Sequence, residues 1–229
     1  MRVALIAFLF LTLFAGCAEK HKEDYVIGFS QCTGDDEWRR AMLDGMQREL
    51  AFHNNTKLIF RDAHANSAVQ VRQIEELLQS GIQLLIVSPN ESDPLTPVIE
   101  QAYKKGIPVV VVDRRTSSPY YTAYVGGDNY QVGKTVGEYA AALLGGNGRM
   151  IEITGLPRSS PASDRHRGLV DALSTRPGIQ RVATLNGQWE KDIAKKELRK
   201  VLPRFPDLDL IFAQNEVMAM GAREVCNEV

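Results

Sequence analysis

The chain has 229 residues, of which 44% are hydrophobic and 24% charged, and its formal net charge is -1. This is the composition of an ordinary globular protein, and the length is sufficient for two compact lobes. A charge so close to zero argues against a nucleic-acid-binding protein, which needs a basic face.

The amino-terminal residues have the pattern of a secretory signal. Arg2 precedes an apolar stretch over residues 3–15 that is too short to span a bilayer as a helix. The four residues FAGC that end at Cys17 are similar to a lipoprotein signal box, although Phe stands where Leu is usual. We therefore expect residues 1–17 to be a signal peptide or a lipoprotein signal, with Cys17 as the candidate lipidation site. Plain cleavage nearby, or retention as an anchor, stays open. The expected location is the periplasm, with membrane contact only through this signal or its lipid.

Strand and helix patterns alternate from residue 25 onward. One junction recurs, because Gly81-Ile82 precedes LLIV, Gly106-Ile107 precedes VVVV and Gly178-Ile179 precedes RVATL. Each glycine follows a helical pattern, and Gly106 fits the left-handed position that ends a helix. Val109–Val112 is apolar without alternation, which is typical of a parallel strand covered on both faces. The repeated junction predicts an α/β chain with parallel sheets.

The first lobe is predicted over residues 25–126. Its helices are expected to begin at the capping residues Asp35 or Asp36, Asn66 and Asp93. The expected strands cover residues 25–30, 57–60, 84–87, 109–112 and 124–126.

The second lobe is predicted over residues 127–229, after a break at Gly126-Gly127-Asp128-Asn129. Its first helix is expected to turn Val132, Val136, Tyr139 and Leu143 inward, and its Gly133 and Gly137 are expected to pack closely against the sheet. Strands are expected at 150–154, 182–185 and 208–212, and helices at 165–174, at 190–202 and from 216 onward. The predicted fold class is α/β, with two Rossmann-like lobes that each contain a parallel sheet.

No motif for enzyme chemistry or metal binding is present. The chain lacks a GxSxG elbow, a phosphate-binding loop and a GxGxxG after its first strand. Its three cysteines and four histidines form no CxxC or Cys/His cluster. We therefore predict no catalytic residue, no metal site and no cofactor, and we leave a Cys32–Cys226 disulfide open.

Charged and aromatic side chains follow the strands of both predicted lobes. In open α/β sheets this carboxyl edge is where ligands bind. Flat aromatic rings suit the C–H face of a sugar ring, and charged groups form strong hydrogen bonds with its hydroxyl rim. The pattern therefore indicates a sugar site. The candidates are Asp36, Trp38, Arg39, Asp113 and Arg114 in the first lobe and Arg165, Trp189 and Asn215 in the second.

Each candidate also has a purely structural interpretation. Convergence on one edge of both sheets favours binding over these alternatives. In the structural interpretation Asp113 and Arg114 form a surface ion pair, and Trp38 is the first core residue of its helix. Trp189 is then a hydrophobic staple, Arg165 a solvated residue at a helix start and Asn215 an ordinary helix N-cap.

Four stretches resemble the type I periplasmic binding proteins, near the ribose-binding protein and the sugar-binding domains of LacI-type repressors. They are IGFSQCTGDDEWRRAMLDGM (27–46), LLIVSPNESDPLTPVIEQAYKKGIPVVVVDRR (84–115), SDRHRG (163–168) and LIFAQNEVMAMGA (210–222). The resemblance covers nearly everything after residue 24. It implies a monosaccharide, pentose or hexose, bound between two lobes whose closure delivers the sugar to an ABC transporter or signals to a membrane sensor kinase, as in hybrid two-component systems.

The resemblance also implies roles for the candidates. It places Asp113, Arg114, Arg165 and Asn215 on sugar hydroxyls, and the two tryptophans Trp38 and Trp189 on the ring faces. Two positions differ from the ribose binder, because Asp36 stands where that protein has an amide and Arg39 where it has an aromatic residue. These differences favour a sugar other than ribose, with a ketohexose such as fructose as the suggested ligand.

The family continues for several elements after the helix that begins near Asn215, so we expect the second lobe to be incomplete at its carboxyl terminus. Two other functions were weighed. A cytosolic LacI-type regulator would need a basic helix-turn-helix where residues 1–24 carry a signal, and a sugar-active enzyme would need a carboxylate pair or a metal cluster.

Overall fold

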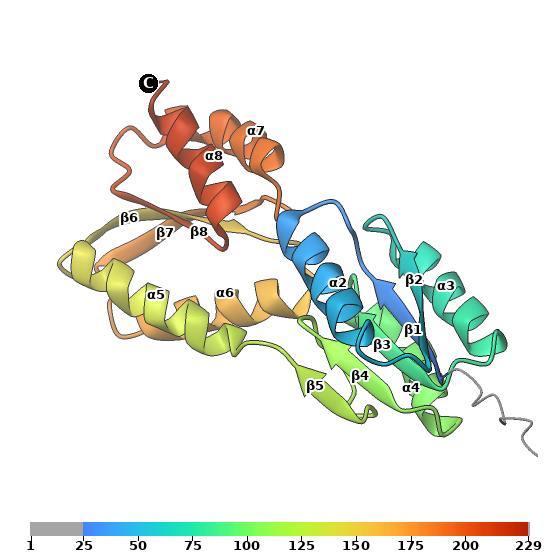
Figure 1. Cartoon of the computed structure of the whole chain (residues 1–229). Coiled ribbons are helices and arrows are strands. Elements are labelled where there is room, and N and C mark those ends of the chain that lie inside the picture. Colours follow the sequence, from blue (N-terminus) through green and yellow to red (C-terminus); the bar gives the residue numbers. More distant parts are fainter. Residues whose placement is uncertain (1–24, 229) are drawn as a thin grey trace, which may run out of the picture.

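The computed structural model describes residues 25–228, which fold into two α/β lobes (Figure 1). The predicted signal and Cys17 lie outside the described residues. Within the described part, no helix has the length and apolar character needed to cross a membrane. The predicted fold class is confirmed, because each lobe is built on a parallel sheet.

The first sheet has the strand order β2-β1-β3-β4-β5, and all its neighbouring strands are parallel. All the strands expected before residue 126 are present. They are β1 (Tyr25–Gln31), β2 (Thr56–Asp62), β3 (Leu84–Ser88), β4 (Val109–Val112) and β5 (Ala123–Val125), and the helices are α2 (Glu37–Leu50), α3 (Ser67–Gln79) and α4 (Ser92–Lys104).

Helices cover both faces of this sheet, as the alternation along β1 shows. Ser30 accepts a hydrogen bond from Gln70 of α3, whereas the next side chain, Gln31, donates to the Arg39 carbonyl of α2. Successive strand residues point to opposite faces, so α3 and α2 lie on opposite sides. The main apolar core is on the α3 and α4 side, where Leu77, Leu85, Val87, Leu95 and Val111 are among its fully buried members.

The second sheet is smaller, with the order β7-β6-β8 and parallel pairing throughout. Its strands are β6 (Gly148–Thr154), β7 (Ile179–Asn186) and β8 (Leu210–Ala213), and its helices are α5 (Asn129–Leu143), α6 (Ser160–Leu173), α7 (Lys191–Val201) and α8 (Glu216–Cys226), with a 3-10 turn η2 (Leu202–Arg204). Helices α7 and α8 lie on one side of the sheet and α5 and α6 on the other (Figure 1). Both faces are therefore covered, as expected of parallel strands.

Of the four residues expected to face inward from α5, only Val136 packs against the core, and the other three are exposed. Val132, Tyr139 and Leu143 are 44%, 64% and 58% exposed, whereas Gly133 and Gly137 are buried. The reason is that the glycine face of α5 packs against α6, while Val136 and Ala141 join the core beneath the sheet. A Cβ atom on Gly133 would lie 2.7 Å from Arg165 Cα of α6 and closer still to its carbonyl oxygen, and one on Gly137 would lie 2.7 Å from Ala172 Cβ. Glycine on this face lets the two helix backbones approach.

Several local predictions can be compared with the structure. Gly81 and Gly106 have φ angles of 80° and 81°, so both take the left-handed conformation that ends a helix. Helix α4 has Glu91 as its N-cap, so the expected cap at Asp93 is wrong by two positions. Cys32 and Cys226 are both free thiols, so the disulfide left open above does not form.

Candidate functional site

The loops that follow β3, β4 and β6 meet where the two lobes face each other. The Ser92 backbone N–H donates to the Arg158 carbonyl at 3.1 Å, and the Arg115 N–H donates to Ser160 Oγ at 2.6 Å. Arg158 also forms an ion pair with Glu91, with 2.6 Å between Nε and Oε1. These contacts bring together the carboxyl edges of both sheets, which is the edge where open α/β sheets bind ligands.

Arg39 is the centre of the first-lobe network. Asp36 caps α2 by accepting the Arg39 N–H at 2.7 Å, so the cap and the functional side chain belong to the same turn. The guanidinium of Arg39 is 4% exposed and donates to Ser88 Oγ at 2.7 Å and to Asp113 Oδ2 at 2.6 Å. These bonds join the first turn of α2 to the ends of β3 and β4 in one polar cluster.

Asp113 and Arg114 turn away from each other. Asp113 has φ 60°, a left-handed conformation in which few non-glycine residues are found, and its carboxylate is directed to Arg39. Arg114 is 6% exposed and donates to the carbonyl and the side-chain oxygen of Asn90, at 2.7 and 3.3 Å. The interpretation of these residues as a surface ion pair is therefore wrong.

The first-lobe arginines sit in an unusual electrostatic setting. Burial lowers the pKa of Arg114, the positive charge of Arg39 lowers it further, and nearby acidic groups only partly offset the two effects. Burial acts the same way on Arg39, but the summed attraction of Cys32, Asp113 and Asp36 outweighs it and the pKa of Arg39 is raised. Two buried cations beside one paired carboxylate form a site with spare positive charge and donor capacity for an oxygen-rich ligand.

Arg165 has the corresponding place in the second lobe. Its Nε donates to Asn129 Oδ1 at 2.9 Å, and its Nη1 donates to the carbonyl of Gln214. The guanidinium carbon lies 5.4 Å from the centroid of the Trp189 ring. Burial lowers the pKa of Arg165, and the carboxylates of Asp113 and Glu216 oppose that shift. The contribution of Asp113 comes from the other lobe, so the two networks are within electrostatic reach of each other.

Trp189 lies flat against Gly155 at the end of β6. A Cβ atom on Gly155 would overlap the indole ring, so glycine is needed for this contact. Trp189 has φ 71°, and its buried Nε1 has no hydrogen-bond partner. Asn215 caps α8 by accepting the Met218 N–H at 3.0 Å, and its amide donates to the Trp189 carbonyl at 3.2 Å. The N-cap interpretation of Asn215 is therefore confirmed, and the cap also braces the tryptophan loop.

Trp38 stands apart from both networks. It is 66% exposed at the start of α2, so its interpretation as a core residue of that helix is wrong. It lies one residue before Arg39, on the same turn of helix. Its exposed indole ring is available to a ligand without any rearrangement of the core.

Three metal-ligating side chains come together near this edge, although the sequence predicted no metal site. Ligand atoms of Asp35, Asp62 and His64 all lie within 4.8 Å of one another. Asp62 also accepts the backbone N–H groups of Gly34 and His64, at 2.9 and 2.8 Å. Asp62 therefore holds the loops after β1 and β2 together. The cluster was not predictable from the sequence, because Asp35 follows β1 whereas Asp62 and His64 are at the end of β2.

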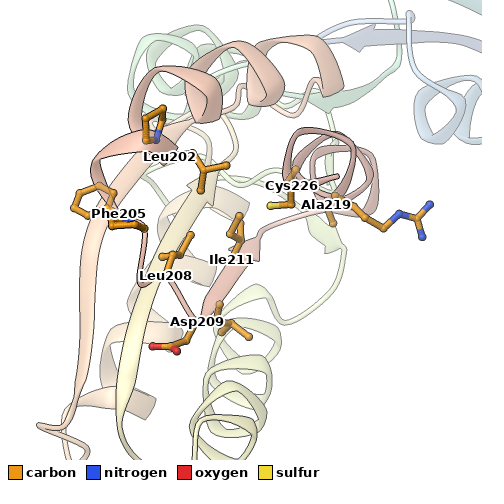
Figure 2. Close-up of a pocket in the computed structure, with 12 residues that line it drawn as sticks. Leu202, Phe205, Leu208, Asp209, Ile211, Ala219 and Cys226 are labelled. Atoms are coloured by element: carbon orange, nitrogen blue, oxygen red, sulfur yellow. The ribbon is translucent and has the colours of Figure 1, made fainter. Parts of the chain in front are cut away.

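A pocket of about 690 Å³ lies elsewhere, between η2, β8 and α8 (Figure 2). Its lining includes Leu202, Phe205, Leu208, Ile211 and Cys226, and none of the predicted site residues takes part. It lies along β8, the edge strand of the second sheet.

A family model described as periplasmic binding protein domain matches residues 27–228. The chain belongs to this family. Among curated relatives, the ribose import binding protein RbsB of Bacillus subtilis (strain 168) is 27% identical over 207 residues, which cover 90% of this chain and 67% of the relative. The D-ribose/D-allose-binding protein of Pseudomonas aeruginosa is 31% identical over 163 residues, which cover 69% of this chain and 51% of the relative.

Among solved structures, the fructose-binding periplasmic domain of a hybrid two-component system is 40% identical and superposes with a TM-score of 0.86. The match covers 89% of this chain and 68% of that one. The chain thus spans between about half and two thirds of the length of these family members. The resemblance to periplasmic sugar-binding proteins, and to the sensor domain of a hybrid two-component system, is confirmed.

Sequence reasoning found the charged and aromatic members of the two networks, but it missed the polar residues that hold them. Asn90 anchors Arg114, while Gln70 and Gln214 lie buried beneath the networks. Gln214 lies inside the FAQNEVMAMGA stretch, which was singled out as a family signature without a role for this residue. A polar residue at the end of an apolar strand was the available signal.

Proposed function

We propose that this chain binds a monosaccharide between its two lobes as the extracytoplasmic domain of a sugar sensor, and that the sugar is fructose. The observation that carries the proposal is the pair of networks on facing sheet edges. Arg39 with Asp113 forms one, and Arg165 with Trp189 forms the other. A ligand between them would contact both lobes, and its differential affinity would stabilise the closed arrangement.

The polar residues would bind the hydroxyl rim of the sugar. Asp113, Arg114, Arg165 and Asn215 are assigned to hydroxyl groups, with Asp36 and Arg39 completing the first-lobe side. Hydrogen bonds that involve a charged group contribute about 1.5–3 kcal/mol each. A few such bonds, together with ring stacking, supply the roughly -8 kcal/mol of a micromolar complex after ordering costs.

The two tryptophans would stack on opposite faces of the sugar ring. Trp189 already has a cation over its ring and a polar atom, Nε1, without a partner. Trp38 is exposed at the start of α2, next in the chain to Arg39. An indole ring presents a flat apolar face, and its N–H can serve a hydroxyl group.

The similarity to the fructose-binding domain, at 40% identity, supports both the ligand and the sensor role. The ribose binder of Bacillus subtilis is more distant, at 27% identity. The charged Arg39–Asp113 pair supports a sugar other than ribose. Delivery of the sugar to an ABC transporter is the alternative output, which the ribose import relatives favour.

We assign the protein to the periplasm and to binding rather than catalysis. The named relatives are binding proteins, and the charged groups of the two networks are engaged with each other or with the backbone. A LacI-type regulator and a sugar-active enzyme are therefore less well supported than a periplasmic sensor.

Calorimetric titration of the chain with fructose, ribose, allose and myo-inositol tests the binding proposal. Fructose is expected to bind in the micromolar range and more tightly than the others. Asp113→Asn should weaken fructose binding at least tenfold, whereas the exposed Asp44→Asn on α2 should not change it. Tighter binding of another sugar would refute the ligand, and no binding by a chain with a folded circular dichroism spectrum would refute the site.

The output is tested separately in the host. Deletion of the gene is expected to abolish fructose-induced transcription while leaving the rate of fructose uptake unchanged. Loss of uptake with intact induction would instead assign the protein to transport.

A further inference from the structure

Gln214, at the end of β8, is a buried residue at which several hydrogen bonds of the second lobe meet. It is 4% exposed, and its side-chain oxygen accepts the Gly155 N–H at 2.9 Å. Its amide nitrogen donates to Glu152 Oε1 at 3.0 Å and to the Ala162 carbonyl at 3.1 Å, while its own carbonyl accepts from Arg165. One residue thus links the glycine beneath Trp189, the first turn of α6 and the arginine of the second network.

Gln70, on α3, does the same in the first lobe. It is fully buried, and its side-chain oxygen accepts the Asn90 N–H at 2.8 Å. Its amide nitrogen donates to Ser30 Oγ at 3.2 Å and to the Ser88 carbonyl at 3.0 Å. Asn90 in turn accepts from Arg114 through both its carbonyl and its side chain.

The two arrangements match bond for bond, although one glutamine comes from a helix and the other from a strand. Each accepts one backbone N–H from the loop at the carboxyl edge of its sheet, and each donates to one backbone carbonyl and one side chain. Each also leads to an arginine of its lobe. Gln214 accepts from the half-buried Arg165 through its backbone carbonyl, and Gln70 holds Asn90, which accepts from the buried Arg114.

We propose that Gln70 and Gln214 are positioning residues for the sugar site, each holding the arginine of its own lobe in the orientation that receives the ligand. This inference rests on the proposed sugar-binding function. An amide side chain suits the task because it has two donors and an acceptor in one plane, and a buried amide with all of them used has no other conformation of similar energy. Neither glutamine needs to touch the ligand.

Fructose affinity in a set of double mutants tests the pairing. Gln214→Met keeps the side-chain volume and the backbone carbonyl that accepts from Arg165, but it removes the side-chain hydrogen bonds to Gly155, Glu152 and Ala162 that hold this carbonyl in place, and it should weaken binding about tenfold in the native background. In an Arg165→Lys background the same substitution should change affinity less than twofold, because the group that it positions is already gone. In an Arg114→Lys background it should keep its tenfold effect.

Gln70→Met should show the opposite pattern, with its effect lost beside Arg114→Lys and kept beside Arg165→Lys. Gln73→Met is the matched control, because this glutamine on α3 donates to the Asp62 carbonyl and has no bond to either arginine network. It should leave affinity unchanged. A merely structural role would give the same loss in every arginine background, and that result would overturn the proposal.

A second measurement needs no sugar. The Arg165 Nε–H is bonded to Asn129, so its ¹H–¹⁵N signal should be protected from exchange and should disappear in Arg165→Lys, which assigns it. The signal should weaken in Gln214→Met and persist in Gln70→Met. If the chain binds no sugar, the proposed function fails while this signal still decides the positioning role. Persistence of the signal in Gln214→Met would refute it.

Discussion

The close contact between α5 and α6 leads to a prediction about stability. Replacing glycine by alanine should have opposite effects on the free energy of unfolding at two helix sites. Gly133→Ala places a methyl group 2.7 Å from the Cα of Arg165 and closer to its carbonyl oxygen. Both partners are backbone atoms, which cannot rotate away, so α5 and α6 must separate. Gly45→Ala adds the same methyl group to α2, where nothing lies within 4 Å.

The expected changes in the free energy of unfolding follow from two opposing effects of the added methyl group. Replacing glycine by alanine in a helix stabilises the fold by about 0.5–1 kcal/mol. Overpacking costs about 1–3 kcal/mol, and the backbone contact at Gly133 places that site near the upper end. We therefore expect Gly133→Ala to lower the free energy of unfolding by about 2 kcal/mol, and Gly45→Ala to raise it by about 0.5–1 kcal/mol.

Urea denaturation followed by circular dichroism measures both variants at one temperature. Because Arg165 lies at the point of contact, Gly133→Ala should also weaken fructose binding, whereas Gly45→Ala should not. A Gly133→Ala variant as stable as the native chain would refute the close approach of the two helices. Destabilisation by Gly45→Ala would refute the argument from free space.

Four further substitutions probe the ion pairs. Asp113→Ala should lower the free energy of unfolding by about 3–5 kcal/mol in urea titrations, because it leaves the buried Arg39 cation unpaired. Asp113→Asn should cost much less, since asparagine still accepts a hydrogen bond and tolerates the left-handed backbone, and equal losses would contradict this. The pKa of Glu224 is lowered from 4.5 to about 2 by hydrogen bonds from two lysines, so its contribution is present above pH 4.5 and is lost as the pH falls to about 2. Glu224→Gln should therefore flatten the pH dependence of stability in that window, and an unchanged slope would refute the assignment. Arg158→Ala removes the ion pair to Glu91 and should weaken fructose binding two- to fivefold with little change in stability, because Arg158 is 70% exposed and the buried Glu91 keeps its hydrogen bond from Ser67 Oγ. A calorimetric titration that shows native affinity would contradict a role in closure.

Much of the fold could be predicted from the sequence, because its strands are short apolar runs bounded by residues that end helices or turn the chain. Gly81 and Gly106 end their helices in the left-handed conformation, as the Gly-Ile junctions predicted. The inward face of α5 could not be read in this way. Its apolar residues Val132, Tyr139 and Leu143 are exposed, and its smallest residues are buried. The periodicity of apolar residues predicts which face of a helix is apolar. In α5 the buried face is the glycine face, because glycine lets the backbones of α5 and α6 approach closely.

The candidate site was predicted where charge and position coincided. Asp113 and Arg165 stood out because charged residues at strand ends are conspicuous. The partner of Asp113 was not predictable, because Arg39 reaches it from a helix 74 positions earlier in the chain. Gln70 and Gln214 were missed for a different reason. The place of Gln214 at the end of an apolar strand was the available signal, but the hydrogen bonds that give both side chains their role exist only after folding.

Within residues 25–228 the chain passes from the first sheet to the second once, at Gly126–Asp128, between β5 and α5. The lobes therefore act as two binding partners on a very short tether, at an effective concentration in the millimolar range or above. Contacts too weak to join separate proteins, such as the Arg158–Glu91 pair, are sufficient at that concentration to bias how the lobes meet. A ligand that bridges the lobes adds its own contacts to these, so a small molecule can change the orientation of a much larger body.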